Sequence, residues 1–408
     1  MTIDTTRRRL LQGTAAAAGL GAFPGMTVIR GAQAAPVGPT TLITIHLDGG
    51  NDTLNTVIPY ANPLYYQLRG SLAIPATSSL PIDSANALHP ALTGLKSLWD
   101  RQRVAIVHGV GYPGFDYSHF QSKQIYWTAD PARGLRLGWL GRAVDSLIGA
   151  NPNTDILAAI RMGGESTKTL DGGRFNAVQI PYDITKFNLG SRNDAQSVAV
   201  KQLLSLPLTN ITNPVQYRVL WNYKTALQAF SKVQAVNTKV TVVPYPQTSL
   251  AANLKACAQL IRSDSAIRVI SLNTGDFDHH VNLLTRHQAQ LTTVDQALKA
   301  FTDDLDQQGL SNQVLIQVLS DFGRRVTPNR GAGTDHGSAQ AAILIGAGVK
   351  AGVVGNAPPL NNLIDNGNLP MQVDFRSLYT TILSGWLGID PAVSITAGGP
   401  FPTLPVLL

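Results

Sequence analysis

Five short runs of apolar residues, rich in valine and isoleucine, recur along this chain and alternate with stretches whose apolar residues have helical spacing. The runs, each of which predicts a buried β-strand, are 42–47, 104–110, 267–272, 314–319 and 341–345. Helices are predicted over about 91–99 and over about 283–308. Because strands that alternate with helices form parallel sheets, we expect an α/β fold with a mostly parallel central sheet flanked by helices on both faces.

Residues from about 150 to 250 interrupt this alternation. Glycine pairs at 163–164 and 172–173 indicate loops, and 215–236 has the pattern of a helix. Such a region is either an insertion that shapes access to a site or a helical subdomain packed on the sheet. Since no linker-like stretch sets it apart, we expect a single domain over 35–408.

The N-terminal 34 residues have the features of an export signal. Arginines at 7–9 precede two leucines, a weakly apolar stretch runs over 13–29, and 32–34 offers a small-x-small cleavage site. We expect a twin-arginine signal peptide over 1–34, export by the twin-arginine translocase and a periplasmic or secreted location. The alternative, a basic arm that binds nucleic acid, leaves the apolar stretch and the cleavage motif without a role.

Charge and hydropathy limit the partners of the mature chain. Removing residues 1–34, with four arginines and one aspartate, lowers the formal net charge from +7 to about +4. That charge is too small to indicate a nucleic-acid partner. Outside the signal, the chain contains no continuous apolar stretch of membrane-spanning length, so we expect no stable membrane insertion.

Four short groups of Asp, His and Ser residues follow predicted strands or lie in the loop before one. The candidate metal ligands in these groups are Asp48, Asp52, His119, Asp278, His280, Asp321, Asp335 and His336. Ligands of open α/β sheets bind beyond the carboxyl ends of the strands, so we expect these side chains to converge there. Carboxylate oxygen and imidazole nitrogen together suit zinc or another divalent transition metal. His46 and His108 lie within strands, where we expect buried core imidazoles.

Two further residues are candidates for catalysis. Ser118 precedes a predicted helix and is either only its N-cap or a nucleophile that the helix N-terminus and a metal activate. Arg324 follows Asp321 and either binds an anionic group of the substrate or forms an ion pair.

These motifs also resemble a known family. The segments that carry the resemblance are 49–60, 88–92, 118–120, 138–142, 278–280, 321–324, 333–337 and 374–376. Together with the twin-arginine signal, they are similar to the exported bacterial domain of unknown function 1501 family, within the alkaline phosphatase and sulfatase superfamily. The resemblance covers nearly the whole chain and implies an alkaline-phosphatase-like α/β domain.

The resemblance implies a site with two metal positions and a Ser or Thr nucleophile. By motif, Asp278, His280 and His336 hold one metal, and the other is held by Ser118, Asp321 and either Asp48 or Asp52. Three positions depart from the pattern. Phe322 stands where alkaline phosphatases have a histidine, His279 where family members often have a threonine, and Asp321 where they often have a glutamate. The second metal therefore borrows His119 or Asp335, lacks ligands, or is absent.

The leading hypothesis is a metal-dependent hydrolase of phosphate or sulfate esters, on a small molecule or a glycan. Zinc is the expected metal, with manganese, calcium or iron as alternatives, in one or two equivalents. A second hypothesis is a non-catalytic secreted protein that binds glycans or envelope partners with the same fold. A third is a metal-dependent transferase or mutase.

Overall fold

The computed structural model describes residues 40–148, 156–163, 167–173, 175, 177–187, 211–236, 241, 243–263 and 266–408, together with 198, 202 and 205. The expected signal peptide, 1–34, lies outside these described residues. Within the described part of the chain, no helix combines the length and the apolar character that crossing a membrane requires.

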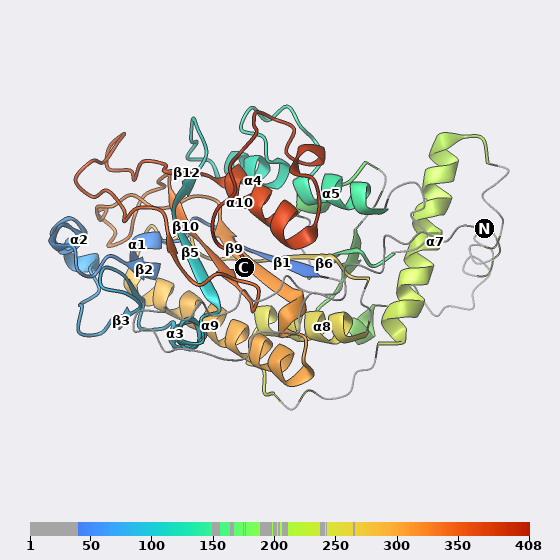
Figure 1. Ribbon diagram of the computed structural model, residues 1–408, viewed down its shortest axis with the longest axis horizontal. Helices are drawn as coiled ribbons and strands as arrows, with labels where there is room; N and C mark the ends of the chain where they lie inside the picture. Colours follow the sequence, from blue (N-terminus) through green and yellow to red (C-terminus); the bar gives the residue numbers. More distant parts are fainter. Residues whose placement is uncertain are drawn as a thin grey trace, which may run out of the picture. The chain divides into compact units, whose positions relative to one another are not determined.

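A nine-stranded sheet forms the centre of the described chain (Figure 1). Its strands, in spatial order, are β11 (Gly352–Val354), β5 (Val104–Gly111), β10 (Gln340–Ile345), β9 (Val314–Ser320), β1 (Thr41–Leu47), β8 (Val269–Thr274), β6 (Ala159–Met162) and β7 (Val178–Ile180), with β12 (Val373–Asp374) paired to β5. A small second sheet contains β2 (Val57–Ile58), β4 (Ala87–Leu88) and β3 (Leu80–Pro81). All five predicted strands are present, with bounds shifted by at most two residues.

The central sheet is mostly parallel, which confirms the expected fold class. Strand β1 runs parallel to both of its neighbours, β8 and β9, and β6 and β7 continue in the same direction. Strand β10 is antiparallel to both β9 and β5. A loop rather than a crossover helix joins β9 to β10, and this connection allows the reversal.

Helices cover both faces of the sheet (Figure 1). On one face lie α3 (Thr93–Asp100), α8 (Ser249–Ser263) and α9 (Leu283–Gln308), and on the other lie α4 (His119–Thr128), α5 (Trp139–Ile148) and α10 (Phe375–Ile382). Because successive strand residues point to opposite faces, Ile43 and Ile45 pack with the first group and Leu42 with the second. The remaining α-helices with described bounds are α1 (Thr53–Thr56), α2 (Pro63–Arg69) and α7 (Pro214–Gln234).

The region from about 150 to 250 contributes to the sheet itself. Strands β6 and β7 extend it beyond β8, and β6 pairs with β8 in parallel. The predicted helix over 215–236 is observed as α7, Pro214–Gln234. Strands from this region thus form one edge of the central sheet.

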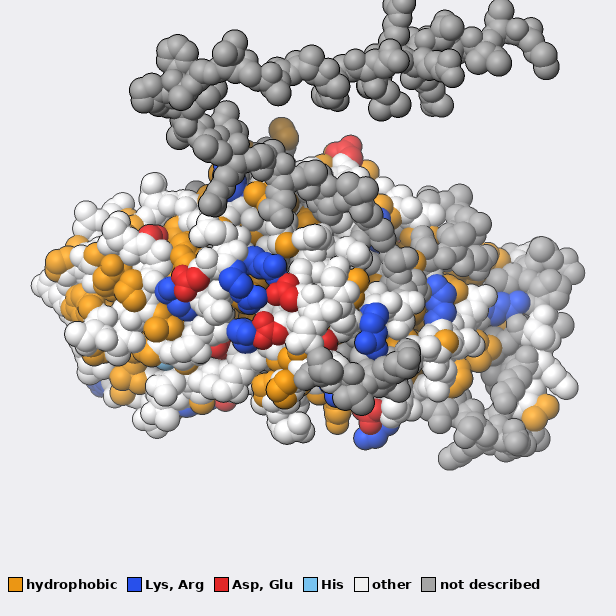
Figure 2. All heavy atoms as spheres, turned by 60° about the horizontal axis from the view of Figure 1, so that its bottom comes forward, with side chains coloured by type: hydrophobic (Ala, Val, Ile, Leu, Met, Phe, Trp, Pro, Cys, Tyr) orange, Lys and Arg blue, Asp and Glu red, His pale blue; other side chains and the backbone are white. Residues whose placement is uncertain are grey.

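The face over α3 and α9 carries charges of both signs (Figure 2). Lys96 pairs with Asp100 at 2.7 Å, and Arg101 pairs with Asp306 at 2.9 Å. Such exposed pairs contribute little to stability. Since Lys and Arg lie beside Asp, their fields largely cancel beyond a Debye length.

Three parallel strands end at the same level. Leu47, the last residue of β1, pairs in register with Thr274 of β8 and with Ser320 of β9. The next residues along β1 and β9 are Asp48 and Asp321. The fold therefore brings two of the candidate carboxylates to one edge of the sheet, as the sequence predicts.

Candidate metal centre

The turn after β1 packs closely against the loop that follows β8. A Cβ atom on Gly49 would lie 2.5 Å from the backbone nitrogen of Asp278, and one on Gly50 would lie 2.6 Å from the Phe322 ring. Both glycines have positive φ angles, 113° and 75°, a backbone conformation that other residues rarely adopt. Glycine at these two positions permits the approach that places Asp278 beside the end of β1.

Four side chains from three segments converge beyond this edge and form what we call the first ligand group: His119, Asp278, His280 and His336. The Nε2 atom of His336 lies 3.1 Å from Nε2 of His119 and 2.9 Å from Nε2 of His280. Asp278 Oδ1 lies 3.2 Å from Nε2 of His336 and 3.0 Å from Nε2 of His280. The structure thus brings together four of the predicted ligands.

The hydrogen bonds of His119 and His336 determine which nitrogen of each ring carries the proton. Nδ1 of His336 lies 2.6 Å from the carbonyl oxygen of Tyr117, and Nδ1 of His119 lies 2.6 Å from Oδ2 of Asp321. Both partners only accept, so both Nδ1 atoms donate. In the neutral rings, the two Nε2 lone pairs then face each other 3.1 Å apart. Such an arrangement is repulsive unless a proton or a metal ion lies between them.

His46, Asp48 and Asp321 form the second ligand group. One ligand atom of each lies within 4.8 Å of the others. Nε2 of His46 hydrogen-bonds Oδ1 of Asp321 and lies 3.7 Å from Oδ1 of Asp48. His119 connects the two groups, because its Nδ1 atom contacts Asp321 while its Nε2 atom faces the first group.

The carboxylates of Asp321 and Asp278 are both held in their charged form. Burial would raise the pKa of Asp321, but hydrogen bonds from His119 and His46 outweigh it and hold that pKa well below its usual value. Burial would also raise the pKa of Asp278, but the hydrogen bond and the charge of Arg324 outweigh it and lower that pKa to about 2. Burial also lowers the pKa of His336, which favours the neutral imidazole that metal binding requires.

Arg324 lies beneath the first ligand group and not at its open side. Its side chain is 1 % exposed, and Nη2 lies 2.5 Å from Oδ1 of Asp278. Nε donates to the carbonyl of Gly50 at 2.7 Å, and Nη1 donates to that of Thr334 at 3.0 Å. Because these donors are taken, the structure favours the ion-pair interpretation of Arg324 over direct binding of an anionic substrate.

Ser118 caps helix α4. Its side chain accepts a hydrogen bond from the backbone nitrogen of Gln121 at 3.5 Å, and its own nitrogen donates to Oδ1 of Asp116 at 2.7 Å. This confirms the N-cap role, and the next residue, His119, is in the first ligand group. The role of Ser118 as a nucleophile stays a prediction.

Two predicted ligands lie apart from both groups. Asp52 is 2 % exposed and forms a buried ion pair with Arg69, so its carboxylate is committed to that cation. This geometry favours Asp48 as the ligand from the β1 turn. Asp335 is half exposed, with Oδ1 3.7 Å from Nδ1 of His280 and 3.1 Å from Nδ2 of Asn329. Asp335 therefore lies beside His280, beyond hydrogen-bonding distance of its ring nitrogen.

Sequence reasoning missed two residues of the site. His46, expected to be a core imidazole, lies in the second ligand group. Lys123 lies with its Nζ atom 3.3 Å from Oδ1 of Asp48. Spacing could have indicated both: His46 shares the strand face of Leu42, which packs with the α4 side, and Lys123 follows His119 by one helical turn.

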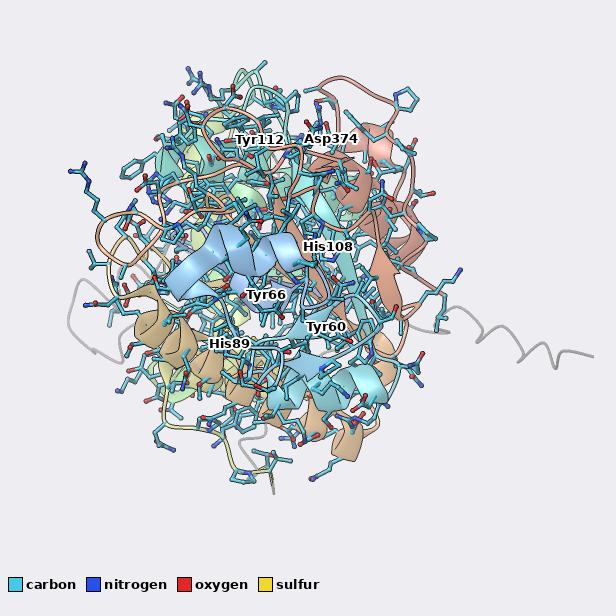
Figure 3. The ribbon with its side chains drawn as sticks, turned by 90° about the vertical axis from the view of Figure 1, so that its left-hand side faces the viewer. Tyr60, Tyr66, His89, His108, Tyr112 and Asp374 are labelled. Carbon is cyan, nitrogen blue, oxygen red and sulfur yellow. The ribbon has the colours of Figure 1, made fainter. Side chains whose placement is uncertain are left out.

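Two other positions have clear packing roles. His108 is fully buried in β5, with Nε2 3.2 Å from Oδ1 of Asn86, which confirms its expected core role (Figure 3). Phe322 stacks on His119 with ring centroids 4.7 Å apart and contacts His336 at 4.9 Å. In this chain it is His119 that offers a nitrogen to Asp321.

The first ligand group fits a transition metal. Zinc bound tetrahedrally at about 2.0–2.1 Å holds its nitrogen ligands about 3.3 Å apart, close to the two distances from Nε2 of His336 to Nε2 of His119 and of His280. His119, Asp278 and His336 each place a ligand atom within 4.8 Å of the others. Ligand histidines normally donate their second ring nitrogen to a carboxylate or carbonyl, as His119 and His336 do here. Three imidazoles and one carboxylate are donors that suit zinc.

Fold and site together define an α/β protein with a candidate metal centre of histidines and aspartates at the carboxyl edge of its sheet. The chain belongs to the family described as "Protein of unknown function (DUF1501)", which matches residues 108–401. No curated protein matches the chain.

The chain is also similar to several solved structures. One is a protein in the alkaline phosphatase superfamily from Vibrio parahaemolyticus, with 13 % identity, 89 % of this chain and 71 % of that chain covered, and a TM-score of 0.40. Another is the C-terminal periplasmic domain of EcEptC from Escherichia coli in complex with Zn, with 11 % identity, 76 % and 73 % covered, and a TM-score of 0.35. The PsFucS1 sulfatase from Pseudoalteromonas sp. has 11 % identity, with 86 % and 68 % covered and a TM-score of 0.37.

Proposed function

We propose that this protein is an exported, metal-dependent hydrolase of phosphate or sulfate esters. The observation that carries the proposal is the pair of facing Nε2 atoms of His119 and His336, 3.1 Å apart, with both Nδ1 atoms committed elsewhere. His119, Asp278, His280 and His336 would hold the metal, with zinc as the expected ion. When bound, the metal supplies a Lewis acid that polarises the ester.

Ser118 is the proposed nucleophile. It lies at the N-terminus of α4, where the first backbone N–H groups have no partner within the helix and attract an anionic group. Its Oγ atom attacks phosphorus or sulfur, the P–O or S–O bond to the alcohol breaks, and the alcohol leaves. Water then cleaves the serine ester and releases phosphate or sulfate, which restores the hydroxyl of Ser118.

The second candidate function is a non-catalytic protein that binds glycans or envelope partners. Phe322 favours it, because this position offers the two histidines a ring contact and no ligand atom. The first ligand group favours the hydrolase, because His119, Asp278 and His336 each place a ligand atom within 4.8 Å of the others and His280 lies 2.9 Å from His336.

Metal content and ester hydrolysis, measured on the same preparations, test the proposal. Mature protein purified without chelator or affinity-tag metal is expected to contain zinc by mass spectrometry and to hydrolyse p-nitrophenyl phosphate or p-nitrophenyl sulfate. Asp278→Asn and His336→Ala should lose both properties. The control is Asp276→Asn, an exposed aspartate in the same loop that pairs with Arg286, and it should retain both. A wild-type protein without metal and without activity would support the binding protein instead.

A further inference from the structure

Lys123 places an ammonium group in the second ligand group. Its Nζ atom lies 3.3 Å from Oδ1 of Asp48, and the two side chains are 20 % and 17 % exposed. Nζ also lies 5.8 Å from the centre of the Trp127 ring, one helical turn further along α4. Lys123 is thus a half-buried cation at the position where the superfamily resemblance places a second metal.

The carboxylates of the second ligand group are already satisfied by protein donors. Asp48 contacts Lys123 through Oδ1 and accepts from Nδ2 of Asn273 through Oδ2 at 2.5 Å. Asp321 accepts from the nitrogen of Gly49 at 2.9 Å, from His119 at 2.6 Å and from His46. The first ligand group differs, because Nε2 of His119 and Nε2 of His336 face each other while both Nδ1 atoms donate elsewhere.

Each group has a cation beside a carboxylate, Arg324 in the first and Lys123 in the second, so the two groups differ mainly in the number of imidazole nitrogens they offer. In the second group, the Lys123 ammonium lies beside one of two carboxylates, so a divalent ion bound there would lie next to a like charge. Phe322 adds no ligand atom, and the nearby Asn273 amide points its nitrogen toward Asp48. The first group has one carboxylate, balanced by Arg324, and three imidazoles.

We propose that this protein binds one metal ion, in the first ligand group, and that the Lys123 ammonium takes the place of a second ion. Lys123 would then bind a non-bridging oxygen of the phosphoryl or sulfuryl group, next to the metal-bound side of the substrate. This inference rests on the proposed function but concerns the number of metal ions, which is measured independently of activity.

Zinc stoichiometry after saturation and desalting tests the proposal. The expected values are one equivalent for the wild type, one for Lys123→Arg, which keeps the charge, and two for Lys123→Met, which keeps the aliphatic packing. The matched control is Lys96→Met, which removes another lysine paired with an aspartate and should bind one equivalent. Two equivalents in the wild type, or one in Lys123→Met, would overturn the inference and leave the hydrolase proposal standing. Zero equivalents in the wild type would overturn both.

Activity gives a second readout. Lys123→Met should lose most of its ester hydrolysis, and excess zinc should restore part of it by filling the second ligand group. Lys123→Arg should keep more activity than Lys123→Met at limiting zinc. Thermal unfolding of each variant confirms that it is folded. A folded Lys123→Met protein that gains neither a second zinc ion nor activity at saturating zinc would contradict the exchange of lysine for metal.

Discussion

The Nδ1 atom of His119 lies 2.6 Å from Oδ2 of Asp321, a carboxylate that is itself fully buried at the end of β9. This contact fixes the protonated nitrogen of the His119 ring and turns Nε2 toward His336. The two residues are 202 positions apart in the sequence. Their pairing joins helix α4 to the central sheet at the point where the candidate ligands meet.

Replacing Asp321 by Asn should weaken metal binding without removing a ligand of the first group. An Asn amide has no negative charge and only one accepting oxygen, so it cannot accept hydrogen bonds from both His46 and His119. His119 then loses its fixed orientation. Loss of a carboxylate behind a ligand histidine typically costs about 10–100-fold in metal affinity. Competition against a zinc-binding dye measures the change, with Asp276→Asn as the control. An unchanged affinity would show that Asp321 does not orient His119.

Substitutions of Ser118 should separate its capping role from its chemical role. Ser118→Ala removes the cap of α4 and should lower the free energy of unfolding by about 0.5–1 kcal/mol, because the observed hydrogen bond is long. Ser118→Asn restores a capping side chain and should recover that stability. Both variants should lose about 10³-fold or more in kcat if the hydroxyl is the nucleophile. Urea unfolding and ester hydrolysis check the two effects, and an active Ser118→Asn protein would leave Ser118 as a cap only.

Arg324→Gln should destabilise the loops around the site. Removing a guanidinium that is 1 % exposed leaves the carbonyls of Gly50 and Thr334 without a donor, which should cost about 3 kcal/mol. The pKa of Asp278 should rise from about 2 toward 3.8. A carboxyl group whose pKa is lower in the folded state stabilises the fold fully above pH 3.8, its unfolded pKa. This stabilisation is lost as the pH falls through 2, its folded pKa.

Denaturant unfolding of wild type and Arg324→Gln between pH 3 and pH 7 measures both effects. The variant should be less stable at neutral pH, and the difference should narrow as the pH falls. Arg325→Gln is the control, since Arg325 is partly exposed and lies 3.9 Å from the half-exposed Asp335. Equal losses in the two variants would contradict the role assigned to Arg324.

Protonation of His108 should destabilise the protein in weak acid. Burial lowers the pKa of His108 to about 4, whereas the unfolded chain binds the proton near pH 6.5. The unfolded state therefore binds more protons between these values, and stability falls as the pH drops from 6.5 to 4. The contribution is on the order of 3 kcal/mol at pH 4.

His108→Gln should show a shallower loss of stability over this pH range. Unfolding midpoints are compared at pH 7 and pH 4.5, with chelator present so that metal release does not contribute. Glutamine retains a donor for Oδ1 of Asn86, which is the observed partner of His108. Parallel pH profiles for the two proteins would contradict the assignment of the titration to His108.

Local patterns in the sequence are sufficient to predict most of the fold. The strand over 314–319 is a continuous apolar run, and all seven residues of β9 are buried. The helix predicted over 283–308 is observed with the same bounds. Ser118 precedes α4 as the predicted N-cap. These features depend on neighbouring residues, so the periodicity and the capping residue already carry the necessary information.

The sequence by itself determined the α/β class, the strands and helices of the sheet region, and the set of aspartates and histidines that lie near its carboxyl edge. Only the tertiary structure decided which of them meet. It pairs Asp52 with Arg69 and buries Arg324 behind Asp278. It also brings Lys123 to Asp48 and His46 to Asp321. Proton positions and ligand geometry depend on contacts between segments that are distant in sequence, such as His119 with Asp321 and His336 with Tyr117. No local periodicity or capping rule encodes these contacts.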